Sequence, residues 1–201
     1  MAKIAIDIAL LLPEAINKIC IDINQKEHSE SFSDLTKLDN HPHITLAMGV
    51  IDEKDIEKVN SKLKEIVEQF SKLNLQISKI YHQITPENKL SYGFEIKLTD
   101  EIKKLHGKIM EELLPMFSYD VIEEMFFLDS DENFAEVSKS WVENYGKNHS
   151  DPENYHPHIS LKCRKAEYHN FPVKFFASKV ALCHQGNYCT CRTILGSHDL
   201  S

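Results

Sequence analysis

Two hexapeptides, far apart in the chain, carry histidine and hydroxyl residues in the same order. HPHITL spans residues 41–46, and HPHISL spans residues 156–161. They differ only at the fifth position, where threonine and serine exchange and the hydroxyl is retained. Because imidazole transfers protons near neutral pH and hydroxyls form hydrogen bonds, the repeat indicates two copies of one chemical arrangement that act together.

Side-chain alternation along a β-strand shows what each hexapeptide can present. On one strand His43 and Thr45 share a face, and on the other His158 and Ser160 do. The isoleucine and leucine of each hexapeptide point to the opposite face, where they can pack against a core. Each strand is therefore expected to hold one imidazole beside one hydroxyl.

Two imidazoles and two hydroxyls in one groove suit the hydrolysis of a phosphodiester. Displacement at phosphorus needs a base that activates water on one side and an acid that protonates the leaving oxygen on the other, and histidine can do either. The hydroxyls can donate hydrogen bonds to the phosphate oxygens and hold phosphorus between the rings. This chemistry requires neither a metal ion nor a cofactor, and the sequence does not indicate which histidine is the acid.

The paired motifs resemble those of the 2H phosphoesterase superfamily, which includes 2′-5′ RNA ligases and cyclic phosphodiesterases. The likeness extends from the early ALLLP segment to the late ALCHQGNYCTC segment, so it covers most of the chain. It implies an α+β fold, in which residues 1–201 form a single bilobal domain with two pseudo-symmetric lobes of antiparallel β-sheet, outer helices and a central active groove. It also implies that His43 and His158 are the catalytic pair and that Thr45 and Ser160 bind the substrate phosphate.

Two residues near the second motif are further site candidates. Lys162 follows Ser160 by two positions, so alternation places it on the same face, where many relatives in the family carry a basic residue. Tyr155 precedes the motif and is a candidate for stacking on a base, with a loop tyrosine that covers apolar surface as an equal alternative. The long stretch between the motifs, especially residues 119–155, departs from the common family pattern and could cap the groove or change which substrate fits.

Metal binding is a competing interpretation of the histidine pairs. His41 and His156 each form a His-x-His pair with a motif histidine, but no Asp or Glu follows at the close spacing that metallohydrolases use. We therefore predict no metal at these pairs. Instead, we expect His41 and His156 to shape the entry into each strand together with the proline that follows.

The cysteines suggest a second, weaker metal hypothesis. A two-residue turn at Gly186–Asn187 would put His184, Cys189 and Cys191 on one face of a hairpin, with Cys183 on the other. Three ligands without an evident fourth favour core thiols over zinc. The five cysteines are an odd number in a chain of 201 residues, which favours free thiols in a reducing compartment and a cytoplasmic protein.

Amino-acid composition indicates the broad class of protein. A chain of this length with 42% apolar residues can bury the core of one domain, and its longest apolar run, IALLLP, is too short to span a bilayer, so no membrane partner is expected. A net charge of −8 argues against nonspecific binding of long nucleic acid. Phosphate recognition is then expected in a local cleft that takes a nucleotide or short RNA, in a protein expected to be monomeric.

Hydrophobic periodicity predicts the elements that position these residues. The predicted strands are 3–12, the first hexapeptide up to Gly49, 73–84, 90–98, the second hexapeptide, and a closing hairpin of VKFFASKVALCHQ and YCTCRTIL. The predicted helices follow Pro13, cover much of 52–73, run from Thr99 or Asp100 to Pro115, and cover 131–146. This order favours an α+β fold with antiparallel sheets over a parallel one.

The sequence thus predicts a metal-independent phosphodiesterase that acts on 2′,3′-cyclic phosphate ends or on short 2′-5′ linked oligoribonucleotides. Ligation of 2′-5′ RNA ends, the reverse reaction, ranks lower. The alternative is a protein that binds a nucleotide or an RNA end in the same groove without turning it over. Retention of all four groups needed for chemistry favours the enzyme.

Overall fold

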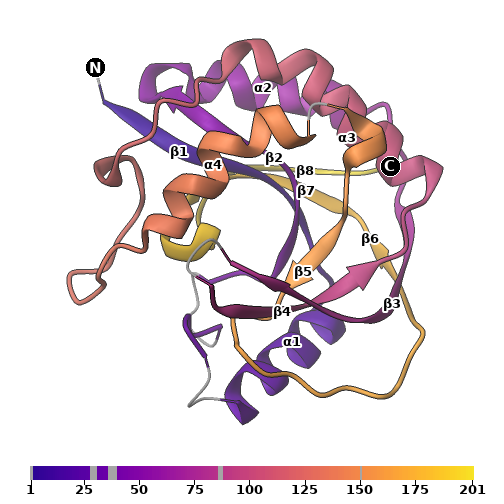
Figure 1. Cartoon of the computed structure of the whole chain (residues 1–201). Coiled ribbons are helices and arrows are strands. Elements are labelled where there is room, and N and C mark those ends of the chain that lie inside the picture. The colour runs from indigo at the N-terminus through magenta and orange to yellow at the C-terminus, as the bar shows by residue number, and fades with distance from the viewer. Residues whose placement is uncertain (1, 28–30, 36–39, 86–87, 150) are drawn as a thin grey trace.

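Eight antiparallel strands form one curved sheet in the computed structural model, which describes every residue except 1, 28–30, 36–39, 86–87 and 150 (Figure 1). The strand order is β6-β3-β4-β5-β2-β1-β7-β8. The strands are β1 (Lys3–Leu11), β2 (His43–Asp52), β3 (Leu73–Ile84), β4 (Leu90–Ile96), β5 (His158–Ser160), β6 (Val173–Ala177), β7 (Lys179–Gln185) and β8 (Cys191–Asp199). The α-helices are α1 (Glu14–Lys26), α2 (Ile56–Val67), α3 (Asp100–Leu113) and α4 (Glu136–His149).

The sheet consists of two halves that meet between β2 and β5. One half is β6-β3-β4-β5 and the other is β2-β1-β7-β8. The inner strand of each half carries one of the hexapeptides, β5 the second and β2 the first. The predicted α+β fold with two antiparallel lobes is confirmed, and pairing between β2 and β5 makes the two lobes one continuous sheet.

A one-residue link explains why the sheet is curved. β6 lies at one edge and β7 lies next to the other edge, yet only Ser178 separates them along the chain. Six steps across a flat sheet would span roughly 29 Å at about 4.8 Å per strand, whereas a link of this length reaches only about 7 Å. The sheet must therefore curl until its ends approach each other, which produces a half-barrel.

Amphipathic helices cover the sheet. α2 packs against β7 and β8, α3 packs against β2, and the two helices contact each other (Figure 1). Their buried residues lie on one stripe of each helix, for example Val59, Leu63 and Ile66 in α2. Thr99 caps α3 by accepting a hydrogen bond from the backbone N–H of Ile102.

Among the described residues, no helix is long and apolar enough to cross a membrane.

The end of the chain differs from the predicted hairpin. VKFFASKVALCHQ forms two strands, β6 and β7, and the turn after β7 is the 3₁₀ turn η6 (Asn187–Cys189) rather than a two-residue turn. The register between β7 and β8 shifts between Leu182 and Cys183 and again between His184 and Gln185. Each shift changes which side chains share a face, so an alternation argument based on a tight turn fails here.

The shifted register brings Cys183 and Cys191 together in a disulfide, with 5.6 Å between the Cα atoms. The prediction of five free thiols is therefore wrong for this pair, whereas Cys20, Cys163 and Cys189 are free and buried. Because Cys191 is bonded to Cys183, it is not available to the zinc site considered with His184 and Cys189.

The disulfide predicts a definite thiol count. Thiol titration of the denatured, unreduced protein should find three free thiols per chain, and reduction should raise this number to five. A Cys183→Ser/Cys191→Ser variant should also show three, and its free energy of unfolding should fall by about 2–3 kcal/mol because the unfolded chain gains freedom. Five thiols in the unreduced wild-type protein would contradict the pairing.

Candidate active site

The pairing of β2 with β5 brings the two hexapeptides into one site. Ile44 pairs with Ile159 in antiparallel register, so His43 falls opposite Ser160 and Thr45 opposite His158. The two isoleucines are fully buried on the other face of the sheet. One face of the sheet therefore carries two imidazoles and two hydroxyls as a compact block, as strand alternation predicted.

The rings of both motif histidines are fixed by the residue two positions earlier. Nδ1 of His43 lies 2.7 Å from the carbonyl oxygen of His41, and Nδ1 of His158 lies 2.9 Å from that of His156. A carbonyl only accepts, so Nδ1 must donate and the neutral ring holds its lone pair at Nε2. The repeated HPH segment therefore sets the tautomer of each catalytic candidate through a backbone group.

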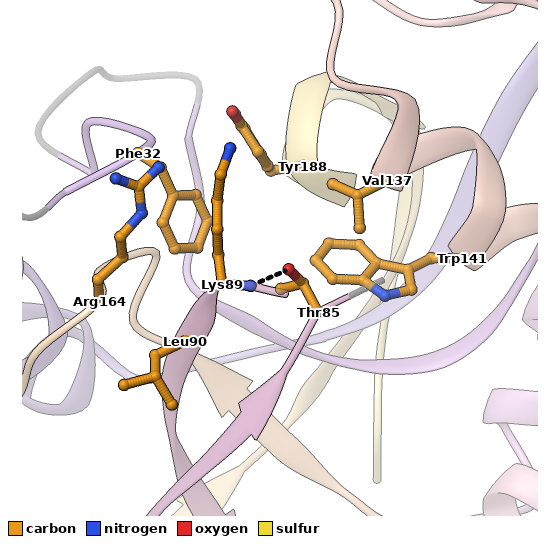
Figure 2. Close-up of a pocket in the computed structure, with 8 residues that line it drawn as sticks. All are labelled: Phe32, Thr85, Lys89, Leu90, Val137, Trp141, Arg164 and Tyr188. Atoms are coloured by element: carbon orange, nitrogen blue, oxygen red, sulfur yellow. Dashed lines mark hydrogen bonds between the residues drawn. The ribbon is translucent and has the colours of Figure 1, made fainter. Parts of the chain in front are cut away.

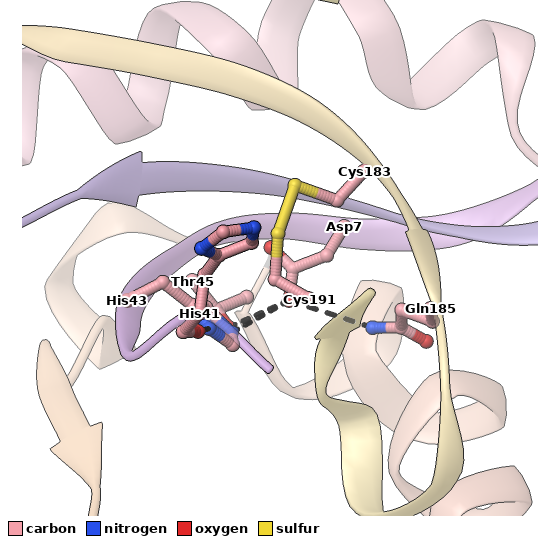
Figure 3. The surroundings of a disulfide bond; sticks show 7 residues. All are labelled: Asp7, His41, His43, Thr45, Cys183, Gln185 and Cys191. Carbon is pink, nitrogen blue, oxygen red and sulfur yellow. Dashed lines mark hydrogen bonds and ion pairs between the residues drawn. A yellow bond between two sulfur atoms is a disulfide. The ribbon is translucent and has the colours of Figure 1, made fainter. Parts of the chain in front are cut away.

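The residue two positions before β2 forms a hydrogen bond with a residue of the disulfide. The backbone N–H of His41 donates to the carbonyl oxygen of Cys191, 3.1 Å away, and Cys191 is bonded to Cys183 (Figure 3). Cys183 in turn pairs with Asp7 of β1. The disulfide thus lies directly beside the backbone that orients His43.

Asp7 is a buried carboxylate that sequence reasoning missed. Its Oδ2 accepts a hydrogen bond from the Thr45 hydroxyl at 2.8 Å and lies 3.4 Å from Nε2 of His43 and 3.4 Å from Nε2 of Gln185 (Figure 3). The side chain is fully buried, and Oδ1 has no hydrogen-bond partner. The Asp7 carboxylate therefore lies within ion-pair distance of the Nε2 atom of His43.

The Thr45–Asp7 bond distinguishes the two hydroxyls. The Thr45 hydroxyl proton is directed to Asp7, so Thr45 can donate to a substrate phosphate only after its hydroxyl rotates. Ser160 has no carboxylate partner among the described residues, and its oxygen accepts a weak bond from the backbone N–H of Lys162 at 3.4 Å. Ser160 is thus the hydroxyl that is ready to donate.

A β-bulge places Thr45 and Asp7 on the same face. Ile8 pairs with Ala47 and Ala9 pairs with Thr45, so Leu46 is an extra residue in β2. After the bulge, Met48 rather than Ala47 lies on the face of Thr45, and Met48 is the partner of Asp7 in β1. The bulge therefore brings a carboxylate from the middle of β1 to the motif.

Tyr155 stabilises this bulge and is not available for base stacking. Its hydroxyl donates to the carbonyl oxygen of Thr45 at 2.8 Å, and its ring stacks on His106 with 3.9 Å between ring centroids. Nδ1 of His106 contacts the carbonyl oxygen of Leu46 at 2.7 Å. Because Tyr155 is only 5% exposed, the base-stacking interpretation is corrected to a structural one.

The backbone conformation that places Lys162 at the site differs from the predicted strand. β5 ends at Ser160, and Lys162 has a left-handed backbone with φ of 52°, so strand alternation does not continue to it. Its side chain nevertheless lines the same cavity as His158 and Ser160, and Nζ donates to the carbonyl oxygen of Tyr188 at 2.6 Å. The structure therefore places Lys162 beside His158 and Ser160, but not through strand alternation.

Burial sets the charge states on the second half of the site. Loss of hydration lowers the pKa of His158 to about 4, with smaller contributions from the nearby His156, Lys162 and His43. Burial likewise lowers the pKa of Lys162 to about 8. At pH 7 the ring of His158 is therefore neutral and Lys162 is mostly charged, which is the state required of a base and of a phosphate ligand.

All four motif side chains and Lys162 line one cavity of about 380 Å³. Residues of α4 also line it, so part of the 119–155 stretch does border the groove. The remaining lining residues are Met48, Gln83, Ser140, Trp141, Asn144, Tyr145, Asn148, His149, Tyr188 and Cys189. A cavity of this size lies near the lower end of the range of about 300–1,000 Å³ that is usual for small-molecule sites.

The sequence matches no family model and no curated protein. Solved structures do resemble it over almost their whole length. TT0787 of Thermus thermophilus is 12% identical, with 98% of each chain covered and a TM-score of 0.62. E. coli LigT, complexed with NADP+, is 14% identical with 99% of each chain covered and a TM-score of 0.57. A protein described as a phosphoesterase is 13% identical, with 100% of this chain and 99% of that chain covered and a TM-score of 0.57.

The chain has the 2H phosphoesterase fold. Identities this low show the fold alone, so the roles of individual residues rest on the geometry of the site. Within this fold the sequence had pointed to the motif residues and Lys162. It had not pointed to Asp7, Trp141 or Tyr188, and the best sequence signal for Asp7 was a single acidic residue inside an otherwise apolar strand.

The structural role of Tyr155 is testable. Tyr155→Phe keeps the ring that stacks on His106 but leaves the Thr45 carbonyl without its partner, so the free energy of unfolding should fall by about 1–3 kcal/mol. Chemical denaturation measures this change, and Tyr81→Phe serves as a tyrosine control. An unchanged stability together with a weaker affinity for nucleotide would instead restore the base-stacking interpretation.

Proposed function

We propose that the protein is a metal-independent phosphodiesterase that hydrolyses RNA-type phosphodiesters, either 2′,3′-cyclic phosphate ends or short 2′-5′ linked oligoribonucleotides. The observation that carries the proposal is the pair of imidazoles in one cavity, each with Nδ1 held by a backbone carbonyl. Acid–base catalysis at phosphorus requires such a pair, and Ser160 and Lys162 add a donor and a charge for the phosphate.

Nucleotide binding by a structural neighbour supports the substrate class. E. coli LigT structures are complexed with NADP+, 3′-AMP, phosphate and ATP. All these ligands contain phosphate, and three of them are nucleotides. A cavity lined by the two motif imidazoles, a lysine and aromatic side chains offers this chain the same kinds of contact.

The environments of the two histidines suggest a direction for proton transfer. We assign His158, neutral at pH 7, as the base that removes a proton from the attacking water. His43, beside the Asp7 carboxylate, is the acid that gives its Nε2 proton to the leaving ribose oxygen. Water oxygen bonds to phosphorus as the ribose oxygen leaves, so a cyclic phosphate opens to a phosphomonoester. Ser160, Lys162 and a rotated Thr45 hold the other phosphate oxygens.

Two other activities are compatible with the same groove. Ligation of 2′-5′ RNA ends is the reverse of the same displacement and needs the same groups, so the geometry alone does not favour it. A nucleotide-binding protein without turnover would not need two rings with matched tautomers. Tight binding of 2′,3′-cyclic nucleotides without any product would favour this binding role.

Removal of either motif imidazole should greatly lower the rate of turnover. His43→Ala and His158→Ala should each lower kcat by about 10²- to 10⁴-fold in the presence of EDTA, the usual contribution of a general acid or base. His156→Ala is the matched control, because it removes a histidine side chain but keeps the carbonyl that holds His158. Near-wild-type turnover by both site variants would exclude the proposed chemistry.

The rate should depend on pH in a way that the two shifted pKa values define. The kcat/KM value should rise as pH increases through about 4, where His158 loses its proton, and should fall no later than about pH 8, where Lys162 loses its charge. The profile is measured with circular dichroism at each pH to confirm that the protein stays folded. A profile that is flat across this range, with chemistry rate-limiting, contradicts the assignment.

A further inference from the structure

One face of helix α4 forms a wall of the active-site cavity. This α4 wall consists of Ser140, Trp141, Asn144, Tyr145, Asn148 and His149. Its residues lie in two rows, 140-144-148 and 141-145-149, because residues four apart share one face of an α-helix. Since α4 packs against β2, which carries the first motif, the wall is held beside the catalytic candidates.

The α4 wall differs chemically from the rest of the cavity. The motifs and Lys162 supply the groups that transfer protons and bind phosphate. The α4 wall supplies amides, a hydroxyl and aromatic rings, and burial lowers the pKa of His149, which keeps that ring neutral at pH 7. Neutral hydrogen-bonding groups beside aromatic rings are the means by which proteins recognise nucleobases. The charged residues of α4 do not line the cavity; they are Glu136, Lys139, Glu143 and Lys147.

Trp141 provides the stacking surface of the α4 wall. Its half-buried side chain also borders a second cavity, whose lining Figure 2 shows. That second cavity holds only about 20 Å³, which admits about one water molecule. The active-site cavity holds about 380 Å³. A nucleobase can therefore stack on Trp141 only from the side of the active site.

Asn144 offers an acceptor of defined orientation next to Trp141. Its Nδ2 donates to the carbonyl oxygen of Ser140 at 2.7 Å. A carbonyl only accepts, so the amide nitrogen must face Ser140, and Oδ1 has no partner within the part of the chain that the structure describes. Because Asn144 follows Trp141 by three residues, the edge of a base on the indole would lie near Oδ1. An acceptor there favours an exocyclic amino group, such as that of adenine.

We propose that the α4 wall binds the base of the nucleotide that carries the scissile phosphate, with the base stacked on Trp141 and its exocyclic amino group donating to Oδ1 of Asn144. This rests on the proposed function and narrows it. The cavity volume lies near the lower end of the range for small-molecule sites, which suits a single nucleotide. The preferred substrate is then an adenine nucleotide with a 2′,3′-cyclic phosphate.

Two substrates that differ in one amino group test the proposal. They are adenosine 2′,3′-cyclic phosphate and purine riboside 2′,3′-cyclic phosphate, which lacks the 6-amino group, both assayed with EDTA. The wild-type kcat/KM should be about 5-fold higher for the adenosine compound, the effect of one neutral hydrogen bond. Asn144→Ala should lower only the adenosine value, so that the ratio between the substrates falls to about one.

A control and a second variant complete the test. Lys147→Ala changes an exposed residue of the same helix that does not line the cavity, so it should keep the wild-type kcat/KM for both substrates. Trp141→Leu should lower both values about 10-fold, mainly through a higher KM, because stacking stabilises the bound substrate and the transition state alike. Circular dichroism confirms that each variant is folded.

The outcomes separate this proposal from the proposed function. Equal wild-type kcat/KM for the two substrates, an adenosine preference that persists in Asn144→Ala, or wild-type values in Trp141→Leu would each overturn the α4 proposal and leave the proposed function standing. If the wild type turns over neither cyclic phosphate, the α4 proposal is wrong. The proposed function fails with it if 2′-5′ linked diadenylate also yields no product.

Discussion

The antiparallel pairing of β2 with β5 at Ile44 and Ile159 is the contact on which the site depends. It is the only named strand pairing that joins the two halves of the described sheet, and it sets the register in which two histidines face two hydroxyls. A slip of one residue by either strand would turn the imidazole and the hydroxyl of that strand towards the core and its isoleucine towards the groove. The single-residue link at Ser178 curls the sheet and brings its ends together behind this junction.

The two motifs are nearly identical in sequence but lie in different surroundings. His43 and Thr45 adjoin a buried carboxylate, whereas His158 and Ser160 lie beside a buried lysine. A carboxylate favours a ring that holds a proton, and a cation together with burial favours a neutral ring. In the proposed mechanism, the asymmetry between acid and base comes from Asp7 and Lys162, which lie outside the repeated hexapeptides.

Sequence reasoning succeeded where a pattern was local. Hydrophobic periodicity predicted most strands and helices, and alternation within a strand correctly placed the imidazoles beside the hydroxyls. It failed at irregular backbone: bulges changed the register of β7 with β8 and paired Cys183 with Cys191, and the left-handed backbone at Lys162 ended the alternation. Such features depend on contacts between distant segments, so they cannot be recognised in the local sequence.

The residues that sequence reasoning missed also depend on distant contacts. Asp7 contacts Thr45 only because Leu46 is an extra residue in β2. Trp141 and Tyr188 line the site only because α4 and η6 pack together.

The most direct test of the account uses isotopically labelled water. The protein is incubated with EDTA and adenosine 2′,3′-cyclic phosphate in H₂¹⁸O, and the product is analysed by mass spectrometry. The account predicts adenosine monophosphate with one ¹⁸O in its phosphate, formed by the wild type and the His156→Ala control and lost in the His43→Ala and His158→Ala variants. Binding of the cyclic nucleotide without labelled product, or labelled product at wild-type rates in both variants, would contradict it.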